Sequence, residues 1–487
     1  MTPSTSSHRH QTNDTPPRLS PGRFVFLMSG PPPDTGRELA IAIYAAAVGG
    51  VDPRTATRNA METRAQSATA PFWIIALGKA SMAMARSAVD VLRLHNAEPE
   101  GGVIIAPEPG VSPHPRITVA VGNHPLPSVE SHAASELIAS VADRIAGRGT
   151  VFVLLSGGAT SLVAAPVEGV SDRDLTWMFN ALLTSGADIT VMNAVRKRFT
   201  RWGAGRLARA LAPATVHCLI VSDVVGDDIP SIASGPCAPD PRSSAEVLAL
   251  IEREGLEPFV PRPLRDFLRD ASPASEPPPV NDPVFERVEC TVILGNRDAL
   301  DAAAASAREL GAGPIRVVGE PLMDDATFTA QRLIDELVRF REASLPDATR
   351  GATSTSRFAC MLWGGETTVR LGAGEPVPGG RCQELALAAA DAVHAEGDRG
   401  VGLTLLAAGT DGRDGNTDAA GAVVDAATWD AIVAAGRDPA EDLSEHRSHD
   451  ALDSVGALVR TGLSGTNVGD VVVGIVERST RQAALRR

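Results

Sequence analysis

The most constraining feature of this 487-residue chain is a set of apolar runs that each stop at a short Gly, Asp, Ser or Asn cluster. The pattern occurs in FWIIALGKAS, VFVLLSGGATS, VHCLIVSDVVGDD, CTVILGNRDA, FACMLWGGE and LTLLAAGTDGRDG, and alanine-rich helical sequence follows most of them. Continuous apolar runs are typical of strands buried on both faces of a parallel sheet. In open α/β sheets, ligands lie beyond the carboxyl ends of the strands, where these clusters would be. The sequence therefore predicts an α/β enzyme whose loops surround a small polar ligand, with a phosphorylated ligand favoured.

Length and charge narrow the possibilities. A chain of 487 residues exceeds one ordinary domain, so two or three are expected. The formal net charge is -14 and the pI is near 5.2. This charge argues against sequence-independent nucleic-acid binding, which needs a basic surface. It leaves an anionic small-molecule substrate open, because local Lys and Arg side chains can override the global field.

The cysteines and the hydropathy pattern predict a cytoplasmic protein. The five cysteines form no CxxC pair, and several lie in strand-like runs, which favours buried thiols in a reducing compartment. No apolar run approaches the roughly 18–20 residues needed to span a bilayer, so no membrane partner is expected. For the oligomeric state, a homodimer remains an open alternative.

Composition divides the chain into three parts. Residues 1–36 are rich in Ser, Thr, Pro and His and predict a disordered tail, within which Met28 is an alternative start. Strands and helices alternate from Phe72 to Asp223, as in right-handed βαβ units. Prolines interrupt this pattern between 240 and 282, and a second α/β block begins at Cys290. We therefore expect domains at 37–285 and 286–480.

Two strand-to-helix turns have the chemistry of a phosphate site. In GKAS, Lys79 follows a strand and precedes a helix N-terminus, whose free N–H groups favour anions. The turn lacks the upstream Gly of a Walker A loop, so a plain turn with a surface lysine is the alternative. SGGATS provides Ser156, Gly157 and Gly158, which can cradle a phosphate or simply form a tight turn.

A basic segment, NAVRKRFTRWGAGRLA, contains Asn193, Arg196 and Lys197 within one helical turn. These side chains could clamp a carboxylate or phosphate, although such clusters are usually solvated helix faces. Gly203, with the residues after it, matches the dinucleotide fingerprint GxGxxA. The match lacks the preceding strand that a nicotinamide site needs.

Three further loops bear charged groups suited to phosphoryl transfer. Asp223 ends a strand in SDVVGDD, where a carboxylate can hold magnesium or orient a hydroxyl. Arg381 begins a helix after GG, in a position to neutralise phosphoryl charge. Asp411 follows a strand in GTDGRDG and is expected to face the ligand. The EF-hand likeness of that loop fails at Ala419, where glycine is needed. The sequence contains no HExxH, CxxC or GxSxG motif, which argues against a structural zinc site or hydrolytic triad.

Taken in order, these segments resemble the class II glycerate 2-kinases, whose C-terminal part is called the MOFRL domain. The likeness covers roughly residues 37–480. It is carried by GKAS, GNHPLP, LLSGGATSLVAAP, NAVRKRF, GAGRLA, SDVVGDDIPSIASGP, ILGNRDALDAA, WGGETTV, GGRCQEL, GTDGRDGNTDAAGAVVD and TGLSGTNVGD. The resemblance implies phosphorylation of D-glycerate at its 2-hydroxyl, with ATP and Mg²⁺. It also implies a larger Rossmann-like domain and a smaller α/β domain facing each other across a cleft.

Carried over by motif, Lys79 and Arg381 should be the essential cations, with Asp223 as a third catalytic residue and the candidate metal ligand. Other residues of the matching motifs are expected to bind substrate or phosphate: Ser81, Asn123, Ser156, Gly157, Gly158, Ser161, Asn193, Arg196, Lys197, Glu366 and Asp411.

The chain departs from the family pattern at Cys382, Val225, Leu463 and Gly469, which leaves the preferred hydroxy acid open. Two other functions remain as alternatives. Some family members are named hydroxypyruvate reductase, which would require a nicotinamide site. A sugar-acid or nucleotide sensor that kept the cleft is the second, although such a protein has less need of Lys79, Asp223 and Arg381 together.

Overall fold

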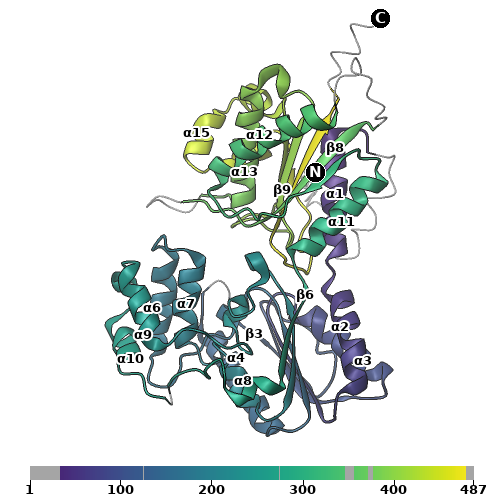
Figure 1. The fold of residues 1–487 in the computed structure, drawn as a ribbon. Coiled ribbons are helices and arrows are strands. Elements are labelled where there is room, and N and C mark those ends of the chain that lie inside the picture. The colour runs from purple at the N-terminus through teal and green to yellow at the C-terminus, as the bar shows by residue number, and fades with distance from the viewer. Residues whose placement is uncertain (1–32, 124–125, 274, 346–355, 371–376, 479–487) are drawn as a thin grey trace, which may run out of the picture.

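The protein consists of two α/β lobes, seen one above the other in Figure 1. The computed structural model describes residues 33–123, 126–273, 275–345, 356–370 and 377–478. Most of the predicted tail, including Met28, lies outside the described residues. Each lobe contains one six-stranded sheet. We call the lobe of the first sheet the lower lobe and the lobe of the second sheet the upper lobe, as they lie in the figure.

The lower-lobe sheet is parallel throughout, in the order β3-β2-β1-β4-β5-β6. Its strands are β1 (Phe72–Leu77), β2 (Pro99–Ala106), β3 (Ile117–Val121), β4 (Thr150–Leu155), β5 (Thr215–Val221) and β6 (Val288–Leu294). This is the strand order of a Rossmann fold, in which the chain reverses direction between β1 and β4. The loops after these two strands therefore lie at the topological switch point, where open α/β sheets bind ligands.

Helices cover both faces of this sheet. One face packs against α2 (Pro53–Ser67) and α3 (Ser81–Leu94), and the other against α4 (Val129–Ile145) and α8 (Arg206–Leu211). The short α5 (Ala159–Leu162) follows β4. A helical cluster with its own core lies beside the sheet, made of α6 (Asp172–Leu183), α7 (Ile189–Phe199), α9 (Ser244–Arg253) and α10 (Arg262–Arg269).

The upper-lobe sheet has the order β11-β10-β9-β12-β8-β7, and all its neighbours are antiparallel except β7 and β8. Its strands are β7 (Ile315–Val317), β8 (Phe358–Gly365), β9 (Leu403–Gly409), β10 (Gly421–Asp425), β11 (Leu458–Val459) and β12 (Asp470–Glu477). One face packs against α1 (Gly36–Gly50) and α11 (Asn296–Glu309). The other is covered by α12 (Ala326–Ser344) and α13 (Arg381–Ala395), with α14 (Thr428–Ala434), α15 (Pro439–Ser444) and α16 (Ser448–Asp453) outside them.

The predicted α/β fold class is confirmed, but two details of the sequence prediction are corrected. FACMLWGGE and LTLLAAG were expected in parallel strands, and they form β8 and β9 of a mainly antiparallel sheet. Both faces of this sheet are buried: Leu405 of β9 packs toward α13, while Leu406 packs toward α1. A continuous apolar run reports burial on two faces, and it does so whichever way the neighbouring strands run.

The second correction concerns the start of the second α/β block. Cys290 was expected to start the second block, yet it lies within β6, which pairs with β5 in the lower-lobe sheet. The N-terminal helix α1 packs on the upper lobe instead, and α2 returns to the lower lobe. The domain limits at 285 and 286 remain a prediction, and sheet membership favours an upper lobe that includes α1.

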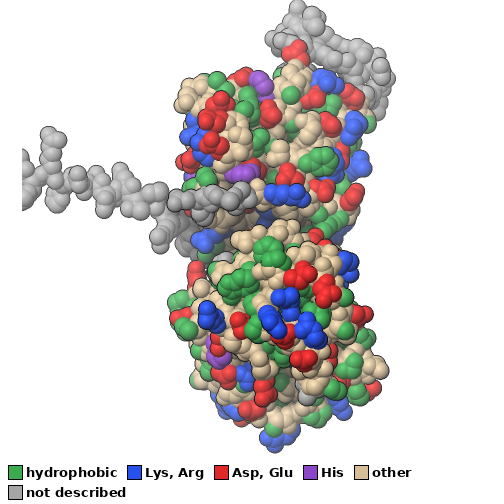
Figure 2. All heavy atoms as spheres, turned by 90° about the vertical axis from the view of Figure 1, so that its left-hand side faces the viewer, with side chains coloured by type: hydrophobic (Ala, Val, Ile, Leu, Met, Phe, Trp, Pro, Cys, Tyr) green, Lys and Arg blue, Asp and Glu red, His purple; other side chains and the backbone are tan. Residues whose placement is uncertain are grey.

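The surface carries charges of both signs. On the face shown in Figure 2, acidic and basic side chains are interspersed over both lobes. Within the described part of the chain, no helix combines the length and the apolar character required to traverse a bilayer.

Candidate active site

The two loops at the switch point interlock. The backbone N–H of Lys79 donates to the carbonyl of Gly157 at 3.0 Å, and the N–H of Ala80 donates to Ser156 Oγ at 2.9 Å. A Cβ on Gly78 would lie 2.3 Å from the carbonyl oxygen of Ser156, so only glycine allows this approach. The contacts fix the start of the Lys79 side chain at the carboxyl edge of the lower sheet.

Lys79 reaches across to the upper lobe. Its Nζ donates to Asp411 Oδ2 at 2.9 Å, and the two side chains are 32% and 20% exposed. Asp411 follows β9, and its other carboxylate oxygen accepts the backbone N–H of Arg413. Both partners were predicted site residues, and this ion pair brings them together from opposite lobes.

Asp223 lies at the same edge of the lower sheet, directly after β5. Its Oδ2 accepts a hydrogen bond from Asn467 Nδ2 of the upper lobe at 2.9 Å. A Cβ on Gly157 would lie 1.8 Å from this oxygen, which explains the glycine. Burial raises the pKa of the Asp223 carboxyl, and the charges of Lys79 and Arg381 oppose that rise. Both predicted cations therefore act on one carboxylate.

Arg381 is held firmly on the upper lobe. Its Nε and Nη2 donate to the two carboxylate oxygens of Asp470 at 2.6 and 3.0 Å, and its Nη1 contacts Glu366 at 2.6 Å. Although burial acts to lower it, these carboxylates raise the pKa of Arg381 well above its usual value. The guanidinium therefore stays charged, in a bidentate geometry that sets its direction.

Arg381 is the first residue of α13, and Asp414 secures that end of the helix. The Asp414 carboxylate accepts the backbone N–H groups of Cys382 and Gln383 at 3.2 and 2.9 Å. Burial, together with the charge of Asp470, raises the pKa of Asp414 to about 6. The loop that resembled a calcium site thus caps the helix that carries Arg381.

Glu366 sits where the two lobes face each other. Its side chain is 42% exposed, but the protein around it raises its pKa to about 7, mainly by desolvation and against the charge of Arg381. Asp470, Asp223 and Lys79 also influence this carboxyl. We call the set the interlobe cluster; it comprises Lys79, Asp223, Glu366, Arg381, Asp411 and Asp470.

Sequence reasoning missed Asp470, Asn467 and Asp414. Asp470 begins β12, and antiparallel pairing brings that start to the edge where β8 and β9 end. In a parallel sheet the residue before a strand lies at the opposite edge from the ligand, so the parallel prediction gave no reason to place Asp470 in the site. A signal was available, since Asn467 and Asp470 both lie in the TGLSGTNVGD motif.

Several predicted binding residues make internal contacts instead. Ser81 is fully buried, and its Oγ donates to the carbonyl of Ile105. The Arg196 guanidinium donates to the carbonyl of Phe179 and lies 4.9 Å over its ring, and burial lowers the pKa of Arg196 to about 10. These contacts argue against direct ligand binding by either side chain.

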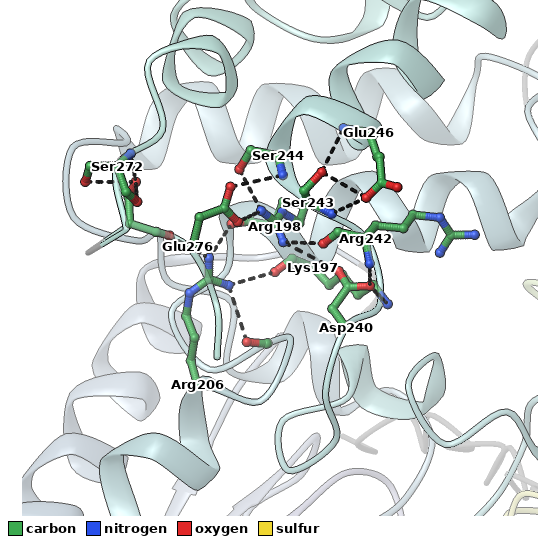
Figure 3. Close-up of polar contacts among 12 residues, drawn as sticks. Lys197, Arg198, Arg206, Asp240, Arg242, Ser243, Ser244, Glu246, Ser272 and Glu276 are labelled. Carbon is green, nitrogen blue, oxygen red and sulfur yellow. Dashed lines mark hydrogen bonds and ion pairs between the residues drawn. The ribbon is translucent and has the colours of Figure 1, made fainter. Parts of the chain in front are cut away.

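Lys197 belongs to a second charged cluster, shown in Figure 3. Its Nζ lies 3.1 Å from Asp240 Oδ1, and the two side chains are 3% and 0% exposed. Arg198 contacts Asp240 at 3.8 Å and also pairs with Glu276. We call these four residues the buried network. Lys197 is thus paired inside the lower lobe, which argues against the predicted clamp.

Four predicted binding residues remain predictions. Asn123 is exposed after β3, and Asn193 is partly buried on α7. Gly158 caps α5 with a φ of 81°, and Ser161 lies within that helix.

The oxygen donors of the interlobe cluster are chemically suited to magnesium. Mg²⁺ in phosphoryl-transfer sites is usually held by one or two carboxylates together with phosphate oxygens and water. In the described part of the chain, no group of three or more His, Cys, Asp or Glu side chains is arranged to hold a metal. Magnesium held by Asp223 together with phosphate oxygens and water therefore stays a prediction.

Comparison with known proteins connects this geometry to a family. A family model described as "Domain of unknown function (DUF4147)" matches residues 39–269, and the MOFRL family model matches residues 359–470. D-glycerate 2-kinase of Thermotoga maritima is 33% identical over 449 residues, which cover 91% of this chain and 99% of that protein. The chain belongs to the glycerate 2-kinase family.

The fold agrees with this membership. A crystal structure of glycerate kinase from Thermotoga maritima matches with a TM-score of 0.74, covering 90% of this chain and 99% of that one. A putative hydroxypyruvate reductase of Agrobacterium vitis is 34% identical, over 90% of this chain and 94% of that protein. The resemblance seen in the motifs is therefore confirmed for this glycerate 2-kinase family member.

Proposed function

We propose that this protein transfers the terminal phosphoryl group of ATP to the 2-hydroxyl of D-glycerate, giving 2-phosphoglycerate and ADP. The observation that carries the proposal is the position of Asp223. Its carboxylate accepts a hydrogen bond from Asn467 of the upper lobe, and the charges of Lys79 and Arg381, from opposite lobes, oppose the rise of its pKa on burial. Phosphoryl transfer depends mainly on positioning and charge neutralisation, and this cluster supplies both.

Each residue of the interlobe cluster has a separate role in the proposed phosphoryl transfer. Lys79 releases Asp411 and contacts a phosphate oxygen, since both groups of that pair are solvent-accessible. Arg381, oriented by Asp470, neutralises charge on the migrating group from the other side. Asp223 accepts the hydrogen of the substrate hydroxyl, a role that its raised pKa favours. Holding magnesium is the alternative role of Asp223, and the metal would then neutralise phosphate oxygens.

A kinase assay with product analysis tests the proposal. Purified protein is incubated with D-glycerate, ATP and Mg²⁺, ADP is quantified, and the phosphorylated carbon is identified by ³¹P-coupled NMR. We expect ADP and 2-phosphoglycerate in equal amounts. Absence of ADP release, or phosphate on the 3-hydroxyl, would contradict the proposal.

Hydroxypyruvate reduction is the second candidate, favoured by the name of the Agrobacterium vitis relative. The GxGxxA stretch offers it little support. A Cβ on Gly205 would lie 2.7 Å from the Phe285 ring and 3.1 Å from the Ala238 carbonyl, so protein already fills this approach. The same preparation with hydroxypyruvate and NADH should show no NADH consumption.

We also propose that the protein acts in the cytoplasm, because all five of its cysteines are free thiols. A homodimer remains an untested expectation.

A further inference from the structure

A cavity of about 190 Å³ lies between the lobes beside Asp223. One wall is the turn Asp223–Asp227 that follows β5 of the lower lobe. The facing wall comes from the upper lobe: the first turn of α11, the segment Val318–Pro321 and the end of β8. We call this cavity the interlobe slot. Asp223 belongs both to the slot and to the interlobe cluster, so a ligand in the slot extends to the reacting centre.

The walls of the slot are mostly apolar. Side chains of Val224, Val225, Leu300 and Val318 line it, while glycines expose bare backbone between them. Gly319 has nothing within 4 Å of an added Cβ, which shows that this part of the wall faces open space. Largely apolar sites with accessible backbone N–H and C=O groups suit heterocyclic bases, which bury their faces and hydrogen-bond along their edges.

Glycerate and the nucleotide differ in how much apolar surface they could bury in the slot. Glycerate carries a carboxylate and two hydroxyls on three carbons, so it could contact Asn296 and Arg297 in the slot but has no apolar surface to bury against the rest of its walls. A nucleotide has a flat base at one end and phosphates at the other. A base in the slot would direct the phosphates past Asp223, toward the cations Lys79 and Arg381.

The rim supplies a carboxylate at Asp227, which lies in the left-handed region with a φ of 54°. Non-glycine residues seldom adopt this conformation. The Asp227 carboxylate oxygens lie 3.1 and 3.2 Å from the position of a Cβ on Gly295, beside the start of α11. A carboxylate at the rim of a nucleotide site can accept hydrogen bonds from ribose hydroxyls, as the acidic residue of dinucleotide-binding folds does.

We propose that the interlobe slot binds the adenosine end of the nucleotide, with its phosphates running over Asp223 into the interlobe cluster. This inference rests on the proposed kinase function and adds the location of the base. It also assigns glycerate, by exclusion, to the side of the cluster away from the slot.

The variant Gly319→Trp tests the proposal, because the backbone there is not in the left-handed region and the space is open. Dissociation constants are measured by calorimetry for Mg·ADP and for Mg·tripolyphosphate, which lacks the nucleoside. We expect the Kd for ADP to rise by about tenfold or more, while the Kd for tripolyphosphate stays within about twofold of wild type.

A second variant and a control keep the test decisive. Val225→Trp fills the slot from the opposite wall and should give the same pattern. Gly49→Trp, also with open space around it but outside the slot, should leave both constants unchanged. Thermal unfolding verifies that each variant is folded.

Different results would overturn the assignment of the base to the slot and the proposed kinase function. Unchanged ADP binding in both slot variants, or equal loss of ADP and tripolyphosphate binding, would overturn the base assignment even if wild type phosphorylates glycerate. A wild type that consumes no ATP with glycerate would instead overturn the proposed function.

Discussion

The buried network and the interlobe cluster use the same residue types, yet they differ in exposure and in origin. Asp240 and Lys197 are almost fully enclosed within one lobe. Lys79 and Asp411 are partly exposed and come from different lobes. A buried pair has its partners permanently, whereas an accessible pair between lobes can exchange one partner for a ligand. A cluster of charged side chains is therefore a candidate binding site only when a ligand in solvent can contact those side chains.

The largest effect should follow loss of either interlobe cation. We expect Lys79→Ala and Arg381→Ala each to lower kcat by about 10³-fold, because each removes charge stabilisation of the migrating group. Lys79→Ala should unfold close to wild type, whereas Arg381→Ala should lose some stability because it leaves the buried Asp470 carboxylate unpaired. Arg437→Ala is the matched control, since Arg437 forms a similar bidentate pair with Asp442 away from the site. Near-normal turnover in a folded Lys79 or Arg381 variant would remove that residue from the mechanism.

The buried network should show the opposite behaviour. Asp240→Asn leaves Lys197 without its buried counter-charge, while Arg198 keeps Glu276, and should cost about 3–5 kcal/mol of unfolding free energy. Assayed well below its melting temperature, the variant should keep wild-type kcat. Glu254→Gln, which breaks the exposed pair with Arg253, should cost only about 0–1 kcal/mol. A large loss of kcat in folded Asp240→Asn would contradict a purely structural role for the buried network.

Loss of Asp414 should affect both stability and kcat, because Asp414 is buried and also supports the helix that carries Arg381. Asp414→Ala removes the acceptor for two helix N–H groups and should cost about 1–2 kcal/mol of stability. It should also lower kcat, since α13 positions Arg381. Asp438→Ala removes an equivalent cap from α15 and should cost similar stability with no change in kcat. Equal kinetic behaviour of the two variants would contradict a positioning role for Asp414.

The smallest effect is a pH dependence at Glu366, whose pKa rises from 4.5 to about 7 on folding. Between these values the unfolded chain has lost the proton while the folded protein retains it, so stability falls as pH rises through this window. Glu366→Gln should therefore raise the melting temperature at pH 8 more than at pH 5. An equal shift at both pH values would show that Glu366 does not titrate in this range.

Much of the site could be predicted from the sequence. Lys79, Asp223, Glu366 and Asp411 each follow a strand-like run, Arg381 begins a helix after a glycine pair, and the structure brings all five to one place. This works because strand ends in an α/β sheet converge on one edge. Hydropathy could not tell the antiparallel upper sheet from a parallel one, because burial of both faces produces the same pattern.

The surroundings of Asp470, Arg196 and Lys197 could not be predicted from the sequence, because they depend on strand direction and helix packing. Asp470 reaches the site because β12 runs against β8 and β9. Arg196 and Lys197 looked like a clamp because a charged helical turn does not reveal which side is buried. Only the packing of α7 against Phe179 and Asp240 distinguishes them from ligand contacts.

A double-mutant cycle on Lys79 and Arg381 tests most directly whether the two lobes act on one migrating group. We predict that the Lys79→Ala/Arg381→Ala variant loses much less kcat/KM than the product of the two single losses, because residues that act as a unit are strongly non-additive. Losses that multiply fully would mean that the two cations act independently, and would contradict the account.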